Sequence, residues 1–252
     1  HIKAVIMAIS EEITTTPETP RKPTPEQQSA VDAPLPTVTL ACPGTGKTFT
    51  MIERIVKAHE SDGIALENMF VATFSKYAAN DMTKRLFDRL EAAPEYIGTF
   101  HRNAIRLYKQ YPQLMNLHGY VPQKIYFATT VSCEEIVERE LEKNKKDIEK
   151  LGLKVRDVKI AFKSVIDYLK SIGIYPIDYH AYTAPKTLDH DLKEMIQIKL
   201  KATGEILFNT MKENDPVDAF WSIYTLYQEV LKQSNSLDYN DVIALPVFAM
   251  RD

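Results

Sequence analysis

Residues 37–54, TVTLACPGTGKTFTMIER, are the stretch of sequence that decides the fold. Their order predicts a short β-strand from Thr37, then a glycine-bearing loop, then a helix that opens at Gly46, Lys47 and Thr48. A loop with few side chains can wrap phosphates with its backbone N–H groups. The helix N-terminus adds unpaired donors and the positive end of the helix dipole. The stretch therefore predicts a loop that binds the phosphates of a nucleoside triphosphate.

The loop follows the pattern G-x-x-x-x-G-K-[ST] except at its first position, where Ala41 replaces glycine. We expect Lys47 to reach the β- and γ-phosphates and the Thr48 hydroxyl to ligate Mg²⁺, so these two residues are the catalytic candidates. An ordinary turn with a surface lysine would not explain the strand and helix patterns on either side. The residues expected to hold ATP in this loop are Ala41, Cys42, Pro43, Gly44, Thr45, Gly46, Lys47 and Thr48.

The composition sets bounds on what the rest of the chain can be. The 252 residues are 44% hydrophobic, which is enough for a substantial core, and the net charge of -3 gives no global sign of nucleic-acid binding. Two cysteines form no disulfide framework, and no apolar run approaches the ~18 residues of a membrane span. We expect an intracellular setting, in cytoplasm and nucleoid or in a nucleus, with no membrane partner. Because the first residue is His1, we also expect a piece or processed form of a longer chain.

Around the loop, strand and helix patterns alternate. Residues 25–31 predict a short helix with Thr24 as its N-cap, and Gln27 in that helix has an amide suited to reading the N6 and N7 edge of adenine. Residues 68–74 predict a buried strand and residues 76–90 a helix. Residues 97–102 predict a further strand end that leads into a helix. Alternation with short joints predicts an α/β fold, a parallel sheet flanked by helices with ligands at the carboxyl ends of its strands.

From residue 112 the pattern becomes mainly helical. Apolar residues at helical spacing recur in residues 158–172 and 220–231, and we expect the aromatic side chains there, including the single Trp221, to form core. The last stretch, from Leu237, predicts a helix that returns to the first domain. The predicted organisation is an N-terminal arm or linker (1–23), the first part of a nucleotide-binding domain (24–111), an inserted helical subdomain (112–236) and a return segment (237–252).

Five segments, taken in order, resemble the motifs of one family. TPEQQSAV resembles the glutamine motif of UvrD/PcrA/Rep-type helicases of superfamily 1, and LACPGTGKTFTMIERI resembles their Walker A segment. VATFSKYAANDMTKRL, GTFHR and SLDYNDVIALPV resemble the family's TFTNKAAxEM, TFHS and DFDDLL segments. The resemblance covers the chain from residue 24 onward and implies a RecA-like nucleotide domain. It also implies an ATP-dependent DNA helicase, with roles in DNA repair or replication and unwinding from 3′ to 5′.

The resemblance also implies roles by position. Gln27 would read adenine, and the loop would hold ATP and Mg²⁺. The positions that match segments contacting single-stranded DNA are Thr73, Phe74, Ser75, Lys76, Thr99, Phe100, His101 and Arg102. Stacking on an aromatic ring and contacts to phosphate suit an enzyme that must bind every sequence. Lysines and arginines are also concentrated in this part of the chain, at Lys76, Lys84, Arg85, Arg89, Arg102, Arg106 and Lys109.

The sequence departs from the family's pattern at three points. The family's Asn-Lys pair is Lys76-Tyr77 here, and we expect Tyr77 to pack beneath the sheet rather than stack on a base. Arg102 replaces a small residue. No acidic Walker B motif precedes Asp252, and the second motor domain with its arginines would come from the rest of the parent chain. We therefore expect this chain alone to hydrolyse ATP poorly.

Two alternatives remain open at this point. The first is the helicase part of a RecB- or AddA-like helicase–nuclease, which a nuclease domain further along the parent chain would distinguish. The second is a P-loop module that binds ATP as a regulatory switch without unwinding DNA.

Overall fold

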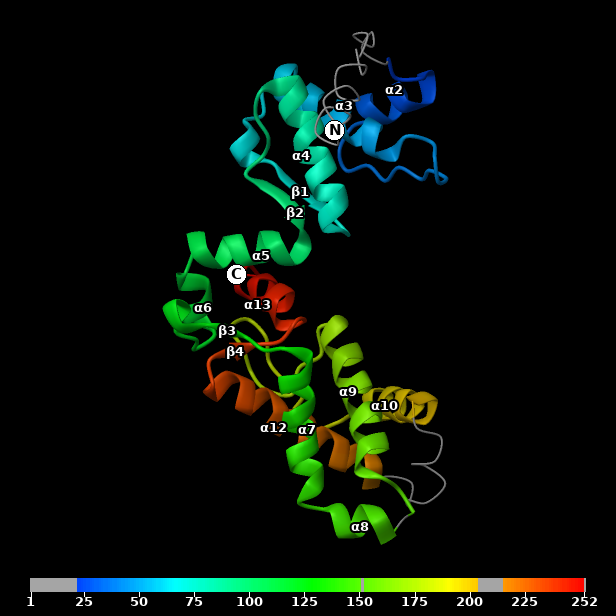
Figure 1. The fold of residues 1–252 in the computed structure, drawn as a ribbon, viewed down its shortest axis with the longest axis vertical. Coiled ribbons are helices and arrows are strands. Elements are labelled where there is room, and N and C mark those ends of the chain that lie inside the picture. The colour runs from blue at the N-terminus through cyan, green and yellow to red at the C-terminus, as the bar shows by residue number, and fades with distance from the viewer. Residues whose placement is uncertain (1–21, 151, 204–214, 252) are drawn as a thin grey trace, which may run out of the picture. The chain divides into compact units, whose positions relative to one another are not determined.

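The computed structural model describes residues 22–150, 152–203 and 215–251 (Figure 1). The chain divides into two compact units, which are described separately. Unit 1 comprises the residues up to Val71 together with residues 75–97, and unit 2 comprises residues 72–74 together with residues 98–252. The arm predicted over residues 1–23 lies almost wholly outside the described residues.

Three helices form the frame of unit 1 in its described residues. Helix α3 packs against both α2 and α4, and strands β1 and β2 form a two-stranded sheet whose last residues are grouped with unit 2. The elements are α2 (Pro25–Asp32), α3 (Lys47–Glu60), the 3₁₀-helix η1 (Leu66–Asn68), β1 (Phe70–Thr73), α4 (Lys76–Leu90) and β2 (Tyr96–Thr99). The core consists of Ile52, Ile55, Val56, Val71, Met82, Leu86 and Ile97.

The helices of unit 1 begin where the sequence predicts. Thr24 caps α2 through a capping box, since its hydroxyl accepts the N–H of Gln27 and the Gln27 side chain accepts the N–H of Thr24. Helix α3 begins at Lys47, directly after the glycines. Helix α4 has the predicted bounds at both ends, and Ser75 caps it by accepting the N–H of Ala78.

The strand predictions are less accurate. The strand expected from Thr37 is not formed: residues 33–46 contain no strand, and Val38 and Leu40 are 87% and 92% exposed. Strand backbone requires a neighbour for its hydrogen bonds, and no described strand pairs with this segment. The strand predicted over residues 68–74 is also shorter than expected, and only Val71 in it is buried. The mixed helix and strand class is confirmed, whereas a parallel sheet around the loop remains a proposal.

Unit 2 is mainly helical. Strands β3 and β4 pair in parallel, with Tyr126 opposite Ser236 and Phe127 opposite Leu237. The elements are α5 (Phe100–Gln110), α6 (Gln113–Leu117), the 3₁₀-helix η2 (Pro122–Lys124), β3 (Tyr126–Phe127), α7 (Thr130–Glu142), α8 (Lys145–Lys150), α9 (Val155–Ser171), α10 (His190–Thr203), α12 (Asp215–Gln233), β4 (Ser236–Leu237) and α13 (Asp241–Ala249).

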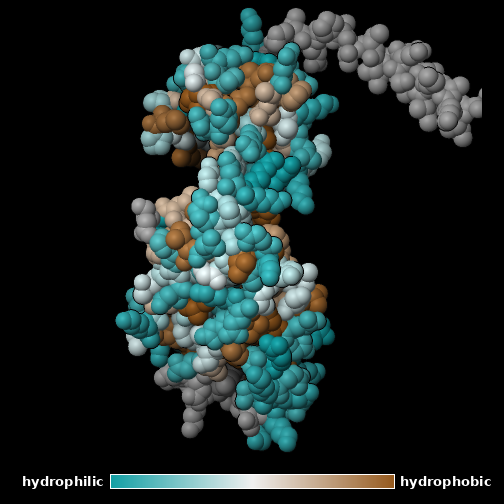
Figure 2. Space-filling model, turned by 90° about the vertical axis from the view of Figure 1, so that its left-hand side faces the viewer, coloured by the Kyte–Doolittle hydropathy of each residue, from teal (hydrophilic) through white to brown (hydrophobic). Residues whose placement is uncertain are grey.

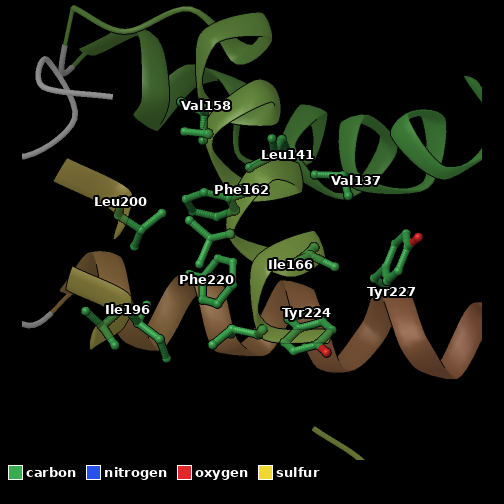
Figure 3. Close-up of a cluster of buried hydrophobic side chains, with 14 of the residues drawn as sticks. Val137, Leu141, Val158, Phe162, Ile166, Ile196, Leu200, Phe220, Tyr224 and Tyr227 are labelled. Atoms are coloured by element: carbon green, nitrogen blue, oxygen red, sulfur yellow. The ribbon is translucent and has the colours of Figure 1, made fainter. Parts of the chain in front are cut away.

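The largest core of unit 2 lies among α7, α9, α10 and α12 (Figure 3). The aromatic residues of α12 point into it as predicted, with Phe220, Tyr224 and Tyr227 fully buried and Trp221 packed against its edge. A second core joins α13 to α5 and α6. The domain boundaries at residues 111 and 236 remain predictions.

Two segments of unit 2 differ from the predicted elements. Helix α5 begins at Phe100, inside the stretch 97–102 predicted as a strand end, because the Thr99 hydroxyl accepts the N–H of Arg102 and caps the helix there. The return segment is a short strand, a turn and then a helix, rather than one helix from Leu237. Helix α13 begins only at Asp241, because Asp238 Oδ1 binds the N–H groups of the turn.

Hydrophilic residues cover most of the face of the molecule in Figure 2, with smaller hydrophobic areas between them. In the part of the chain that the structure describes, no helix is both long and apolar enough to cross a bilayer.

Candidate nucleotide and nucleic-acid sites

A pocket of about 720 Å³ opens in unit 1 beside the predicted phosphate loop. Its walls come from α2, from the loop and from the first two turns of α3. The residues that line it are Thr24, Glu26, Gln27, Ala30, Thr39, Leu40, Ala41, Cys42, Gly44, Thr45, Lys47, Thr50, Met51 and Arg54. A pocket of this size lies in the range of small-molecule sites in proteins.

The loop conformation depends on its two glycines. Gly44 and Gly46 have φ angles of 81° and 85°, in the left-handed region that side chains disfavour. A Cβ at Gly44 would meet nothing within 4 Å, so backbone conformation rather than crowding requires glycine there. Gly46 is the N-cap of α3 and offers no side chain to its first N–H groups. These donors at the start of α3 are suited to an anion.

The Lys47 side chain binds the backbone at the start of the loop. Its Nζ donates to the carbonyl oxygens of Ala41 and Cys42, at 3.1 and 2.9 Å. The Thr45 hydroxyl donates to the same Cys42 oxygen at 2.8 Å. The ammonium group thus lies at the mouth of the loop and remains exposed, where it can approach a bound anion.

Gln27 connects α2 to the loop. Its Nε2 donates to the carbonyl oxygen of Thr45 at 2.9 Å, while its Oε1 accepts the N–H of Thr24 at 3.0 Å. Each end of the amide retains one further hydrogen-bonding position. Arg54, for which no role was predicted from the sequence, donates to the carbonyls at the end of α2, including that of Ala33 at 2.8 Å. Because Arg54 follows Lys47 by two helical turns, it lies on the same face of α3, and this spacing could have predicted its place in the pocket.

The structure brings six of the nine predicted nucleotide-site residues to the pocket, namely Gln27, Ala41, Cys42, Gly44, Thr45 and Lys47. Pro43, Gly46 and Thr48 do not line it. Glu26 is the one carboxylate among the lining residues. No group of three His, Cys, Asp or Glu side chains suited to a metal occurs within the described ranges. Lys47 and the glycine loop are suited to bind a phosphate, and the role of Thr48 as a Mg²⁺ ligand stays a prediction.

The residues predicted to contact DNA fall in both units. In unit 2, Phe74 is fully exposed and Phe100 is 55% exposed, whereas the Thr99 hydroxyl caps α5. In unit 1, the Ser75 hydroxyl caps α4 and Lys76 is exposed. Thr73 is the half-buried last residue of β1.

One expectation about this region is wrong, and another needs qualification. Tyr77 is 85% exposed and does not pack beneath a sheet, because it lies on the outer face of α4 opposite the buried Ala79 and Met82. The predicted concentration of positive charge is also partly neutralised. Arg85 pairs with Asp81 at 3.0 Å and Arg89 pairs with Glu53 at 2.7 Å.

His101 is held by the return segment of the same unit. Its ring stacks on Tyr239, with centroids 3.4 Å apart and planes 24° apart. Its Nε2 lies 3.0 Å from the carbonyl oxygen of Tyr239, and because a carbonyl only accepts, this nitrogen carries the proton. Partial burial lowers the pKa of His101, which favours the neutral ring. No role for Tyr239 was predicted from the sequence.

Asp238 and Asp241, close to Tyr239 in sequence, are buried with a lysine, and the sequence did not predict this. Lys170 of α9 lies 2.5 Å from Asp238 Oδ2 and 2.7 Å from Asp241 Oδ1, and all three side chains are almost inaccessible. The hydroxyl of Tyr227 donates to Asp238 at 2.7 Å, and Gln228 Nε2 donates to Asp241 at 3.2 Å. A lysine in a helical pattern reads as a solvated residue, so the sequence carried no signal for this cluster.

The cluster contains one positive and two negative groups, and its pKa values reflect this imbalance. Burial and the neighbouring Asp238 raise the pKa of Asp241 to about 6. Burial also acts to raise the pKa of Asp238, but the charge and hydrogen bond of Lys170 outweigh it, so the pKa of Asp238 is lowered. Asp241 is therefore the carboxyl that takes up a proton first.

We expect unit 2 to become more stable, relative to its Asp241→Asn variant, as the pH falls from 7 to 4. The folded pKa of Asp241, about 6, lies above its ordinary value of 3.8, so folding favours the protonated carboxyl across this window. The difference in unfolding free energy between the two proteins should change by no more than about 1.4 kcal/mol per pH unit. Urea unfolding followed by the fluorescence of Trp221, the single tryptophan and a residue of unit 2, measures the difference. A difference between the two proteins that does not change with pH would contradict the expectation.

One family model covers both the loop and the helical part of the chain. Residues 23–252 match the UvrD/REP helicase N-terminal domain, and the chain belongs to this family.

Individual relatives are ATP-dependent DNA helicases and helicase–nucleases. The chain is 27% identical over 210 residues to the ATP-dependent DNA helicase SRS2 of Saccharomyces cerevisiae, which covers 81% of this chain and 16% of that protein. It is 33% identical over 144 residues to an ATP-dependent helicase/nuclease protein of Streptococcus uberis, covering 49% of this chain and 12% of that protein. It is 34% identical over 96 residues to a probable DNA helicase II homolog of Rickettsia conorii, covering 37% of this chain and 14% of that protein. The chain thus spans less than a fifth of these relatives.

Proposed function

We propose that this chain is the N-terminal part of an ATP-dependent DNA helicase or translocase and that it binds ATP–Mg²⁺ in the unit 1 pocket. The observation that carries the proposal is the pocket itself. Its lining includes Lys47 and the left-handed Gly44, next to the uncapped start of α3, and this supports the proposal in a chain that belongs to the UvrD/REP family. In this site Lys47 and the loop N–H groups would bind phosphate oxygens, and Gln27 would contact adenine.

The Thr48 hydroxyl would hold a Mg²⁺, which would supply positive charge to the bound triphosphate. Within the described residues, Glu26 is the only pocket carboxylate that could orient water. We therefore also propose that the 252-residue chain binds ATP more readily than it hydrolyses it. The second motor domain of the parent protein would supply the further groups.

The second ligand in the proposal is single-stranded DNA. Phe74 is fully exposed, and Phe100 and Arg102 are exposed at the start of α5. Lys76, Lys84, Arg102 and Lys109 have no ion pair within the described ranges. Aromatic faces and unpaired cations are the contacts that bind a strand of any sequence. The family resemblance supports movement from 3′ to 5′ and a RecA-like domain with an inserted helical subdomain.

A second candidate is the helicase part of a helicase–nuclease. Relatives named as ATP-dependent helicase/nuclease proteins, from Streptococcus uberis and Moorella thermoacetica, favour it. The two candidates share the ATP and DNA sites of this chain. A nuclease domain elsewhere in the parent chain would separate them.

Replacing Phe74 by alanine is expected to weaken the binding of single-stranded DNA about 5- to 150-fold, because a base stacked on an aromatic ring contributes ~1–3 kcal/mol. Fluorescence anisotropy of a labelled oligothymidine at low salt measures the effect. Phe87→Ala is the matched control, since Phe87 is also exposed, at 59%, but lies outside the predicted site. Equal affinities of the two variants would refute the role of Phe74, and an absence of binding by the unmodified chain would refute the DNA-binding proposal.

A further inference from the structure

Arg54 of α3 binds the C-terminal end of a different helix. Its guanidinium donates to the carbonyl oxygens of Ala30 and Ala33 at 2.6 and 2.8 Å. It also donates to the carbonyl oxygen of Val31 at 3.2 Å. The last carbonyls of a helix have no partner within that helix, and this end carries partial negative charge. Because α2 has no basic residue in its own last turn, Arg54 caps it from outside.

Helix α2 contributes little to the apolar core of unit 1. It is eight residues long, Val31 is its one buried apolar side chain, and none of its residues belongs to that core within the described ranges. A helix of this length is not stable by itself in water. Polar contacts therefore fix its position, since Gln27 binds the phosphate loop at its start and Arg54 binds its end. Asp32 and Lys57 add an exposed ion pair at 2.9 Å.

Gln27 and Arg54 both line the nucleotide pocket, but its two functions depend on them differently. An amide reads a base through hydrogen bonds, whose strength falls steeply with misalignment. Gln27 is aligned only while α2 keeps its place. Phosphates would instead meet Lys47 and the loop, which adjoin the start of α3, the helix that carries Arg54 itself. Loosening α2 should therefore disturb recognition of the base and leave the binding of phosphates intact.

We propose that Arg54 is a positioning residue that gives the nucleotide site its preference for adenine. By binding the last carbonyls of α2, it holds the Gln27 amide at the angle at which the edge of the base can be read. The proposal rests on the ATP site proposed above and adds a determinant of selectivity outside the phosphate loop. Arg54 acts through α2 and contacts neither the base nor the phosphates.

The test compares how the full 252-residue chain and its variants bind ATP, GTP and inorganic tripolyphosphate, each with Mg²⁺, by isothermal titration calorimetry. The unmodified chain is expected to bind ATP more tightly than GTP. Arg54→Ala is expected to lower the ratio of these two affinities about 2- to 10-fold, which corresponds to the loss of one hydrogen bond. Its affinity for tripolyphosphate, which has no base, is expected to stay unchanged.

Two further substitutions test whether the effect passes through Gln27. Gln27→Ala should lower the same ratio, and adding Arg54→Ala to it should change the ratio no further, because residues that act through one contact are not additive. Lys57→Ala is the matched control, since it removes another cation that links α3 to α2, from an exposed pair whose contribution is small. Its ratio of ATP to GTP affinity should equal that of the unmodified chain.

The outcomes separate this proposal from the function on which it rests. An unchanged ratio in Arg54→Ala, an equal fall in Lys57→Ala or a further fall in the double variant would overturn the positioning role alone. An equal loss for all three ligands would assign Arg54 a general structural role instead. Equal affinities of the unmodified chain for ATP and GTP would overturn the adenine role of Gln27 as well. No binding of ATP or tripolyphosphate by the unmodified chain would overturn the nucleotide site itself.

Discussion

Replacing Lys47 by alanine is expected to weaken the binding of ATP about 10- to 150-fold. Hydrogen bonds that involve charged groups contribute roughly 1.5–3 kcal/mol each, and Lys47 is the cation at the mouth of the loop, exposed and directed at the Ala41 and Cys42 carbonyls. Isothermal titration calorimetry with ATP and Mg²⁺ measures the affinity. Binding rather than turnover is the readout because we propose that the chain alone hydrolyses ATP slowly.

Lys84→Ala serves as the matched control for this substitution. Lys84 is an exposed lysine of α4 in the same unit, outside the pocket and without an ion pair in the described chain. Removing it lowers the overall charge by the same amount, so general electrostatic effects cancel. If Lys47→Ala and Lys84→Ala bound ATP with the same affinity, the pocket would not be a phosphate site of the proposed kind.

Replacing Lys170 by methionine is expected to destabilise unit 2 by about 3–5 kcal/mol. The substitution leaves Asp238 and Asp241 buried with no positive partner, and removing one member of a buried ion pair has a cost of that size. Urea unfolding followed by Trp221 fluorescence measures the loss, since Trp221 lies in α12 beside Tyr224.

Two further variants isolate the cause. Lys159→Met removes another lysine of α9, one whose partner Glu138 is exposed, and should cost no more than about 1 kcal/mol. Combining Lys170→Met with Asp238→Asn and Asp241→Asn removes all three charges and should recover part of the lost stability. A loss of similar size in all three variants would contradict the stabilising role of the buried Lys170 charge.

Local signals in the sequence predicted the helices of unit 1 well. Thr24 followed three residues later by Gln27 specifies a capping box, and Gly46 before Lys47 specifies where α3 begins. These features depend on residues within one turn of each other. The strand at Thr37 failed for the opposite reason, because a strand is stabilised by partners distant in sequence, and the described residues provide none beside Val38 and Leu40.

The same contrast between local and long-range signals holds for the residues of the candidate sites. The motif predicted the phosphate loop, and Gln27 and Lys47 line one pocket beside it. The His101–Tyr239 pair joins residues 138 positions apart, and no local pattern could have paired them. Tyr77 was misplaced because a single tyrosine in a helical pattern does not say which face of α4 it occupies. Arg89 was counted among the positive charges near the DNA-binding positions, but in the structure it forms an ion pair with Glu53 of α3.

The link between Lys170 and Asp238 has a consequence for the order in which the chain folds. It spans 68 residues, so the entropy of closing a long loop opposes the contact until much of unit 2 is in place. During synthesis the lysine of α9 emerges well before its acidic partners, and it remains in water until residues 238–241 follow. We therefore expect the ammonium group to be buried late in folding, after residues 238–241 have reached it.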